Sequence, residues 1–404
     1  MFTRRSLPLI PLCVLSCLLV SANSARAQHE PAIGGGVIGG GSTSTSRPTS
    51  TKPTNKPSST TPSRPTTSST KPRPTTPVRK PTTSNNATAD NYYQQGEALY
   101  NQSNYKEALD LYLKAVEINP SMATALYRIG WIYNDLEDYD SALDALKKVT
   151  SMQPNNSAAW FEFGYANKKL EHYSEALSAF QQALRVKPDY ASAHYQIGWI
   201  YNDQKNYDDA VNSLKSALRY RSDYPEAHNE LGYAYRNLGR YSEAIEEYQE
   251  TIRLKPDLAV AHLGLGDVYY YNTKQYAEAA NEYKRGLDLK PDNATAFYNL
   301  GWCYNDLERY NEAIDALRNA VRIQPQYPEA HNEMGYALHQ LRRFMEAVQE
   351  YRTAIQQKPN YPSAHYNLGM SFVALNNKTA ALEQYRILQR IDNARATKLF
   401  SQIK

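Results

Sequence analysis

Apolar residues recur at helical spacing in two adjoining segments near residue 130. In the stretch ALYRIGWIYNDL, residues 125–136, the small or apolar positions include Leu126, Ile129, Gly130 and Tyr133. In the stretch YDSALDALKKV, residues 139–149, the corresponding positions are Tyr139, Ala142, Leu143, Leu146 and Val149. Steps of three and four residues place such side chains on one face of an α-helix. The pattern therefore predicts two amphipathic helices joined by a short polar turn.

The same helix pair recurs along the chain with a period of 34 residues. Prolines mark this period at Pro120, Pro154, Pro188, Pro256, Pro291, Pro325 and Pro359, with one step of 35 and with Ser222 in the place of one proline. A glycine series keeps the same register: Gly96, Gly130, Gly164, Gly198, Gly232, Gly266, Gly301, Gly335 and Gly369. So does an alanine series: Ala108, Ala142, Ala176, Ala210, Ala244, Ala279, Ala313, Ala347 and Ala381. A fixed period of this length predicts nine stacked units over residues 89–392.

Each member of these series has a physical role in a helix pair. Gly and Ala have almost no side chain, so they are expected where two helices cross closely. Proline follows the second helix and ends it, because it cannot continue the backbone hydrogen-bond ladder. One extra residue lies within YYYNTKQY, residues 269–276. We expect this insertion to lengthen the turn between the two helices of the sixth unit.

The pattern resembles the tetratricopeptide repeat (TPR) family. One unit supplies most of the family's motif, with Trp160, Phe163, Gly164, Ala176, Phe180, Ala183 and Pro188. The resemblance implies an all-α fold, a right-handed α-solenoid of nine stacked helix-turn-helix units. Residues 393–404 have apolar residues near helical spacing and predict a capping helix over the last unit.

The first 27 residues are typical of an export signal. Two arginines precede the apolar run LPLIPLCVLSCLLV, and Ala25 and Ala27 form a small-residue cleavage site before Gln28. The run of 14 residues is short for a membrane-spanning helix. The sequence therefore predicts a signal peptide at residues 1–27, with an uncleaved anchor as the alternative. Cys303 is then the one cysteine of the mature chain, so no intramolecular disulfide is expected.

Residues 28–88 predict a disordered linker that is rich first in Gly and then in Pro, Thr, Ser and Lys. The whole chain has a formal net charge of +4. The leader contributes three arginines, residues 31–88 contribute eight Lys or Arg and no acid, and Glu30 contributes one negative charge. Residues 89–404 therefore carry a net charge of −6. An acidic body argues against nucleic-acid binding. The linker is interpreted as a solvated spacer, a glycosylated segment, a contact to an anionic envelope surface, or a segment that docks on the repeats.

The first helix of each unit has a stripe of aromatic and amide residues that lies apart from the faces predicted to pack against neighbouring helices. The sequence GWIYND occupies residues 130–135 and 198–203, and GWCYND occupies 301–306. The unit after each contains the pattern Glu-x-Gly-Tyr-Ala, at 162–166, 230–234 and 333–337. In proteins similar to this one, the stripe lines a concave groove that binds partners. Large rings are frequent in binding hot spots, and amides pair with extended peptides.

We therefore predict binding of a protein or an extended peptide by this stripe, with no cofactor. The predicted partner-binding residues are Tyr127, Trp131, Asn134, Asp135, Phe161, Tyr165, Tyr195, Trp199, Asn202, Asp203, Tyr233, Tyr298, Trp302, Asn305, Asp306 and Tyr336. Two alternatives concern their roles. In the first, the rings stack mainly on one another and stiffen the array. In the second, charged residues pair between repeats, as Asp135 with Lys169 and Asp203 with Arg236.

The sequence contains no recognisable catalytic or metal-binding motif. Five histidines recur at one place in the repeat, at His194, His228, His262, His331 and His365. Successive units are about 8–10 Å apart, which is too far for two imidazoles to share an ion, so these residues are expected to pack between helices.

The sequence thus favours a non-enzymatic interaction scaffold of a bacterial cell envelope, periplasmic or secreted to the surface. The alternatives are a recognition subunit of an envelope enzyme, such as a glycosyltransferase or peptidase complex, and a structural spacer.

Overall fold

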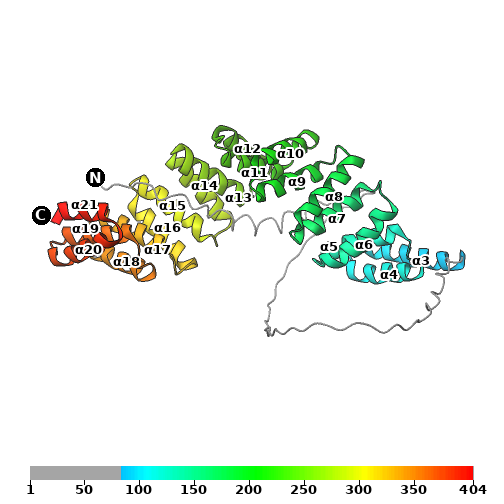
Figure 1. The fold of residues 1–404 in the computed structure, drawn as a ribbon, viewed down its shortest axis with the longest axis horizontal. Coiled ribbons are helices and arrows are strands. Elements are labelled where there is room, and N and C mark those ends of the chain that lie inside the picture. The colour runs from blue at the N-terminus through cyan, green and yellow to red at the C-terminus, as the bar shows by residue number, and fades with distance from the viewer. Residues whose placement is uncertain (1–82, 404) are drawn as a thin grey trace, which may run out of the picture. The chain divides into compact units, whose positions relative to one another are not determined.

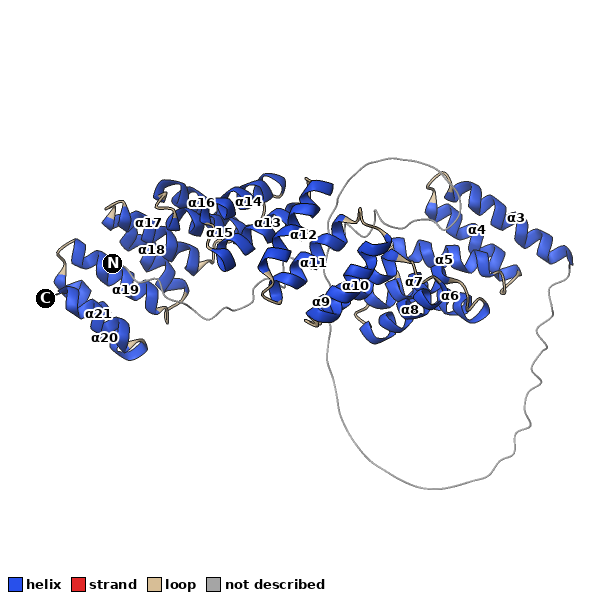
Figure 2. Cartoon of the chain, turned by 90° about the horizontal axis from the view of Figure 1, so that it is seen from above, coloured by secondary structure: helices blue, strands red, loops and turns tan. Residues whose placement is uncertain are grey.

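The computed structural model describes residues 83–403, which are helical apart from short turns (Figure 1). Figure 2 shows helices and loops in this part of the chain and no strand. The described residues fall into two compact units, residues 83–154 and residues 155–403. The predicted signal peptide and the linker up to residue 82 lie outside the described residues. None of the described helices is both long enough and apolar enough to cross a membrane.

The first unit contains two helix pairs: α3 (Thr83–Tyr100), α4 (Tyr105–Ile118), α5 (Ala123–Asp135) and α6 (Tyr139–Met152). Helix α3 begins at Thr83, within the predicted linker, so the expected boundary at residue 89 is six residues too late. The first turns of α3 contain Asn, Thr and Ala and no proline, so nothing in them interrupts a helix. The nearest proline before them in the sequence is Pro81.

The second unit contains seven helix pairs and a terminal helix. Its first four pairs are α7 (Ser157–Lys169) and α8 (Tyr173–Val186), α9 (Ala191–Asp203) and α10 (Tyr207–Tyr220), α11 (Pro225–Asn237) and α12 (Tyr241–Leu254), and α13 (Ala259–Asp267) with η2 (Val268–Thr273) and α14 (Tyr276–Leu289). The others are α15 (Ala294–Asp306) and α16 (Tyr310–Ile323), α17 (Pro328–Gln340) and α18 (Phe344–Gln357), and α19 (Pro362–Ala374) and α20 (Lys378–Ile391), followed by α21 (Asn393–Ile403). In each pair we call the first helix A and the second B.

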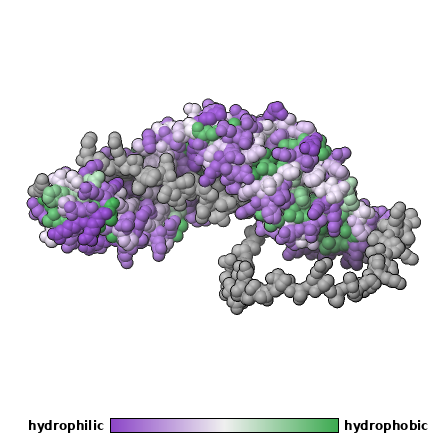
Figure 3. Space-filling view, in the orientation of Figure 1, coloured by the Kyte–Doolittle hydropathy of each residue, from purple (hydrophilic) through white to green (hydrophobic). Residues whose placement is uncertain are grey.

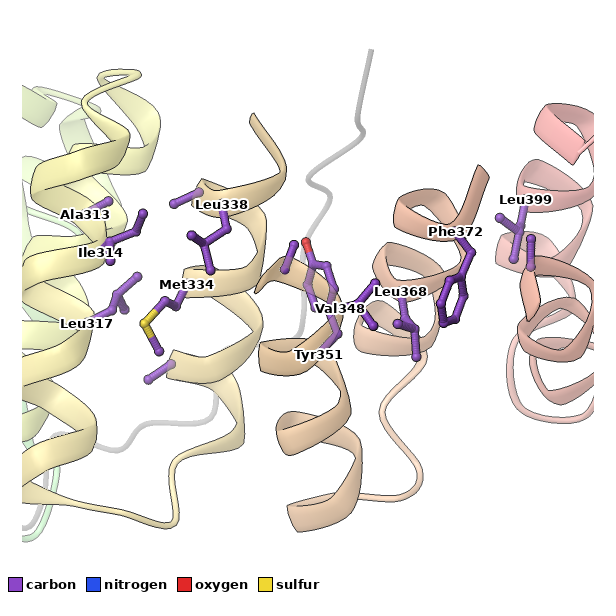
Figure 4. Packing of buried hydrophobic residues seen from close by; sticks show 14 of the residues in the cluster. Ala313, Ile314, Leu317, Met334, Leu338, Val348, Tyr351, Leu368, Phe372 and Leu399 are labelled. Atoms are coloured by element: carbon purple, nitrogen blue, oxygen red, sulfur yellow. The ribbon is translucent and has the colours of Figure 1, made fainter. Parts of the chain in front are cut away.

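The glycine and alanine series lies where the two helices of a pair cross, as predicted. A Cβ atom added at Gly198 would lie 2.6 Å from Cγ of Leu214 on the facing B helix. Ala210 and Leu214 are themselves fully buried. Figure 4 shows the same kind of packing in the last units, where Leu317, Met334 and Tyr351 fill the space between successive helices. Close crossing thus buries apolar clusters between successive helices of this unit.

A left-handed residue ends the first helix of every pair. Eight of these turn positions are occupied by residues other than glycine, namely Ser103, Glu137, Glu171, Lys205, Lys274, Glu308, Arg342 and Asn376. The ninth is Gly239, with φ of +76°. Such a residue lets the chain reverse within about three residues, which keeps the two helices of a pair adjacent.

The extra residue of the sixth unit lies in a helix and not in a turn, so that prediction was wrong. Helix α13 continues into the π-helix η2, which absorbs the insertion as a wider turn of helix. A single added residue fits this way because a π-turn holds one residue more than an α-turn. Consequently Tyr269, Tyr270 and Tyr271 all belong to helical structure at the end of an A helix.

Helix α21 confirms the predicted cap. Its apolar face buries Ala396, Leu399 and Ile403. Leu399 packs against Gly369 of α19, so that a Cβ atom at that glycine would lie 2.5 Å from it. The cap therefore covers the apolar face that the last unit would otherwise expose.

Candidate functional site

The sixteen predicted partner-binding residues all lie on A helices, but they differ in exposure. Asp203 is exposed. Half-buried positions are Tyr127, Trp131, Asp135, Trp199, Tyr233, Tyr298, Trp302, Asp306 and Tyr336. Buried positions are Asn134, Phe161, Tyr165, Tyr195, Asn202 and Asn305. The buried six offer a partner little surface in this conformation, and their direct contact with a partner stays a prediction.

Two of the buried asparagines connect neighbouring helix pairs of the second unit. Asn202 Nδ2 donates to the main-chain oxygen of Glu230 and to its carboxylate, both at 2.9 Å. Asn305 Nδ2 donates in the same way to the main-chain oxygen of Glu333 at 3.2 Å and to its carboxylate at 3.4 Å. The patterns at 198–203 and 230–234, and those at 301–306 and 333–337, are therefore two halves of one contact between successive A helices. The alternation of the two patterns along the sequence was the signal for this contact.

These contacts define two equivalent groups of side chains. The Trp199 module consists of Lys168, Gln196, Trp199, Asn202, Asp203 and Glu230, on helices α7, α9 and α11. The Trp302 module consists of Tyr270, Tyr271, Asn299, Trp302, Asn305, Asp306 and Glu333, on η2, α15 and α17.

The Trp199 module encloses a lysine. Lys168 is 8% exposed, and its Nζ donates to Gln196 Oε1 at 2.5 Å. The same Nζ lies 4.2 Å from the centroid of the Trp199 ring. Burial, and secondarily Lys169, lowers the pKa of Lys168 to about 7, although the negative charges of Glu230 and Asp203 oppose this change.

Glu230 of the same module is also perturbed. Burial raises the pKa of Glu230, and the hydrogen bond from Asn202 and the charge of Lys168 partly offset that rise. Arg236 on the same helix forms an ion pair with Asp267 at 2.7 Å. The Glu230 carboxylate thus accepts a hydrogen bond from a neutral amide, whereas the Asp267 carboxylate forms an ion pair with an arginine.

The Trp302 module is built from tyrosines where the Trp199 module has a lysine. Tyr270 stacks on Trp302 with ring centroids 5.7 Å apart, and its hydroxyl donates to Asp306 Oδ2 at 2.6 Å. The Tyr271 hydroxyl donates to Asn299 Oδ1 at 2.9 Å. Tyr298 lies 5.3 Å from Trp302 on its own helix. The π-helix supplies both η2 tyrosines, because it brings two successive rings to this place.

The rings of the stripe contact one another as well as solvent. In the first unit, Trp131 lies 5.3 Å from Tyr100 and 5.5 Å from Tyr105. Arg128 lies 4.2 Å from the centroid of Tyr100 and pairs with Glu97 at 2.8 Å. Mutual stacking is therefore a real component of the stripe, and it holds the half-exposed rings in fixed positions. Figure 3 shows hydrophilic residues over most of the face in view, with hydrophobic residues in smaller patches.

The repeated histidines brace the A helix of a pair against its B helix. His228, His262 and His331 approach the carboxylates of Glu247, Glu282 and Glu350 through Nδ1 at 2.6–2.7 Å. Nε2 of His262 also lies 3.0 Å from the main-chain oxygen of Pro256. The packing role predicted for these histidines is confirmed. Among the described residues, no group of three or more His, Cys, Asp or Glu is arranged to hold a metal ion.

Replacement of His262 with glutamine is expected to remove stability at acidic pH more than at alkaline pH. The hydrogen bond to Glu282 raises the pKa of His262 above its ordinary value of 6.5, against the effect of burial. The stabilisation is then complete below about pH 6 and is lost as the pH rises through the raised pKa. Urea unfolding should show that the wild-type advantage is larger by about 1 kcal/mol at about pH 5.5 than at about pH 9.

His194→Gln is the matched control, because burial lowers the pKa of His194 and its partner is the Pro188 carbonyl at 3.0 Å. Its pH dependence should have the opposite sign. The same slope for both variants would contradict the role of Glu282.

The second unit also contains a surface pocket and a buried cysteine, and neither is part of the two modules. A surface pocket of about 490 Å³ between α14, α15 and α16 is lined by Lys284, Asp288, Tyr304 and Glu312 among others, and it shares no residue with either module. Cys303 is fully buried, and burial raises the pKa of its thiol, so the reactive thiolate is disfavoured.

Solved structures of similar fold have low sequence identity to this chain. The TPR protein YrrB, described with "an unusual peptide-binding site", is 23% identical, with a TM-score of 0.44, over 47% of this chain and 99% of its own. MamA is 24% identical, with a TM-score of 0.40, over 42% of this chain and 92% of its own. PilF of Pseudomonas aeruginosa is 21% identical, with a TM-score of 0.45, over 53% of this chain and 97% of its own. No curated protein matches the chain.

Sequence models of one family match most of the described residues. Models described as tetratricopeptide repeat match residues 85–155, and residues 161–213 and 263–328. A model described as TPR repeat matches residues 198–239, 232–272 and 343–376. These matches coincide with the helix pairs of both units, and the chain belongs to the tetratricopeptide repeat family.

Proposed function

We propose that this protein is a non-enzymatic scaffold that binds an extended protein segment along the stripe of its A helices. The family supports a role in protein–protein interaction. The finer proposal, binding at the stripe, depends on the residues of the two modules.

The half-buried rings of the stripe carry this proposal. Trp199, Tyr233, Trp302 and Tyr336 keep part of their surface accessible while their backbones are fixed by helix contacts. Their neighbours are held by Asn202 and Asn305, so the rings are ordered before a partner arrives. A preordered ring loses little entropy on binding, which makes it a strong contact residue.

The proposal includes export to a cell envelope or surface. It is supported by the basic and apolar residues of the segment 1–27 and by the Pro-, Thr- and Ser-rich composition of residues 28–88. In this arrangement the linker holds the repeats away from an attachment point.

Simultaneous replacement of Trp131, Trp199 and Trp302 with alanine is expected to weaken partner binding at least tenfold, or by about 1.4 kcal/mol. The partner is first identified by crosslinking the native protein in intact cells, followed by mass spectrometry. Binding to the purified full chain is then measured by calorimetry, and circular dichroism monitors the helices. Met345→Ala, a change at a residue that is 62% exposed, is the surface control.

Unchanged affinity in a triple variant that remains helical would exclude the stripe as the binding surface. Failure to crosslink any partner in stoichiometric amount would instead favour a structural spacer.

A further inference from the structure

The negative charge of the repeats is concentrated in the first unit. Residues 83–154 contain ten Asp or Glu and five Lys or Arg, which gives a net charge of −5. Residues 155–404 contain thirty Asp or Glu and twenty-nine Lys or Arg, which gives a net charge of −1. Residues 31–82, with eight Lys or Arg and no Asp or Glu, directly precede the first unit. The acidic part of the repeats and the basic segment are therefore neighbours in sequence.

Most carboxylates of the first unit lie on α4, on α6 and in the turn between α5 and α6. We call these exposed residues the acidic face: Glu107, Asp110, Glu117, Glu137, Asp138, Asp140 and Asp144. None of them forms an ion pair within the described residues, and α4 and α6 together contain four lysines and no arginine. In the second unit, by contrast, several exposed carboxylates of the B helices pair with arginines one turn away, as Glu312 does with Arg309.

A tyrosine of α5 lies beside the acidic face. Burial, and then the charges of Asp138 and Asp110, raise the pKa of the half-buried Tyr133 above its ordinary value of 10.0. Both carboxylates therefore lie close to the Tyr133 hydroxyl, one from α4 and the other from the residue before α6. In the repeat register, Tyr133 corresponds to Tyr235 and Tyr304 of the second unit.

In the second unit a cation lies over the corresponding ring. Arg240 is 4.4 Å from the centroid of Tyr235, and Arg309 is 4.6 Å from that of Tyr304. Each arginine is the residue before a B helix, and the residue at this place in the first unit is Asp138. The first unit thus has the ring but a carboxylate in place of the cation. A cation from elsewhere would be attracted there by the ring and by two carboxylates.

The surface pocket between α14, α15 and α16 shows which residues surround this ring in the repeat. It is lined by Tyr304, Lys284 and Asp315 among others. Leu113 and Asp144 correspond to the last two in the first unit. Leu113 is 41% exposed, so an accessible apolar side chain stands where the second unit has a lysine.

The basic segment combines a cation with an apolar ring. Of the eight Lys and Arg in residues 47–80, seven directly precede a proline: Arg47, Lys52, Lys56, Arg64, Lys71, Arg73 and Lys80. The cation suits the carboxylates, and the proline ring suits the apolar surface of Leu113 and Tyr133. The repeated Lys-Pro and Arg-Pro pairs therefore match the acidic face in both charge and apolar character.

The segment is also long enough to reach the acidic face. Helix α3 begins at Thr83 and has 18 residues, so it is about 27 Å long. Lys71 precedes Thr83 by twelve residues, which span up to about 37 Å when extended. Attachment to the same chain gives an effective concentration in about the millimolar range. A contact too weak to persist between separate molecules can therefore be populated within one chain.

We infer that residues 47–80 dock on the acidic face of the first unit, with a Lys-Pro or Arg-Pro pair at Tyr133 between Asp110 and Asp138. This docking is electrostatic, so added salt weakens it. It uses none of the sixteen predicted partner-binding residues and is independent of binding at the stripe. It shortens the distance at which the linker can hold the repeats from an attachment point.

Crosslinking within the full chain tests the docking. A short amine-reactive reagent joins nearby lysines, and mass spectrometry measures the yield of each joined pair. The pairs to follow connect Lys71 and Lys80 with Lys114, Lys147 and Lys148 of α4 and α6. We expect their yield to be higher by about fivefold or more at about 20 mM salt than at about 500 mM salt.

Neutralising the acidic face should remove this effect without altering any lysine. We expect the yield at low salt to fall by about fivefold or more in the triple variant Asp110→Asn, Asp138→Asn and Asp144→Asn. Asparagine also caps helices well, so the start of α6 is retained. The matched control removes three exposed carboxylates of the second unit, by Asp208→Asn, Asp209→Asn and Glu278→Gln. Its yield should stay within about twofold of wild type.

A second variant changes the segment and leaves the repeats intact. Replacement of Arg47, Arg64, Arg73 and Arg79 with glutamine halves the charge of the segment and keeps its four lysines. The yield should fall by about threefold or more. Circular dichroism monitors folding of all variants, and this one decides the outcome if the triple aspartate variant fails to fold.

A yield that changes with neither salt nor these substitutions would show that the segment is near the acidic face only because it is attached, and would overturn the inference. A mixture of isotope-labelled and unlabelled chains identifies the other possible occupant. Crosslinks that join labelled to unlabelled chains would place the segment of a second copy on the acidic face and would likewise overturn docking within one chain. Either result leaves the proposed function in place, with the triple tryptophan variant as its separate test.

Discussion

Gly198→Ala is expected to lower the free energy of unfolding of the second unit by about 2 kcal/mol, although alanine is the better helix former. The added Cβ atom would lie 2.6 Å from Leu214 Cγ and 3.3 Å from the main-chain oxygen of Ala210. Leu214 is fully buried, and a backbone oxygen cannot turn aside, so helices α9 and α10 must separate. Urea unfolding and amide exchange in these helices would measure the loss.

Gly239→Ala is the control for this change, since it adds the same methyl group at a place with space. Its nearest neighbour would be the Tyr241 hydroxyl at 3.9 Å, but its φ of +76° disfavours alanine. We expect a loss of about 1 kcal/mol from the backbone alone. A Gly198→Ala variant as stable as wild type would show that the helix crossing is looser than described.

Lys168→Met is expected to make the second unit more stable than wild type at about pH 6, by on the order of 2 kcal/mol. Burial lowers the pKa of Lys168 from 10.5 to about 7. Between these values the unfolded chain holds a proton that the folded chain lacks, so wild-type stability rises with pH. Below about pH 7 the folded chain must hold a buried ammonium, and methionine avoids this cost.

The advantage of Lys168→Met should therefore shrink as the pH rises from about 7 to about 10. Denaturant midpoints at several pH values would measure it, with Lys284→Met on the exposed face of α14 as the control. A difference between Lys168→Met and wild type that does not change with pH would contradict a lowered pKa for this lysine.

Most of the fold could be predicted from the sequence because each repeat encodes its own helix pair. The glycine and alanine series identified the helix crossings, and the apolar pattern of residues 393–404 identified α21. The start of α3 was missed because Thr83–Thr88 lack apolar periodicity, so nothing local distinguishes them from the linker. The π-helix was missed because one inserted residue fits a turn or a helix equally well until tertiary contacts select between them.

The candidate site was predicted only in part. The stripe of A-helix residues is present, and it contains the half-exposed tryptophans. The roles of Asn202 and Asn305 were not foreseen, because their acceptors on Glu230 and Glu333 belong to the next unit. The alternative interpretation paired Arg236 with Asp203, whereas the ion pair in the structure joins Arg236 to Asp267.

The sequence by itself determined the repeat, the order of the helices and the residues that form the stripe, because helical periodicity is a local property that 34 residues are enough to display. The tertiary structure alone decided which stripe residues are buried and which cation or tyrosine lies against each tryptophan. These properties depend on distances between units, and residues such as Lys168 and Trp199 meet across a separation in sequence that helical periodicity does not describe. Burial in turn shifts the pKa of Lys168 and Glu230, since desolvation acts only when neighbouring units exclude water.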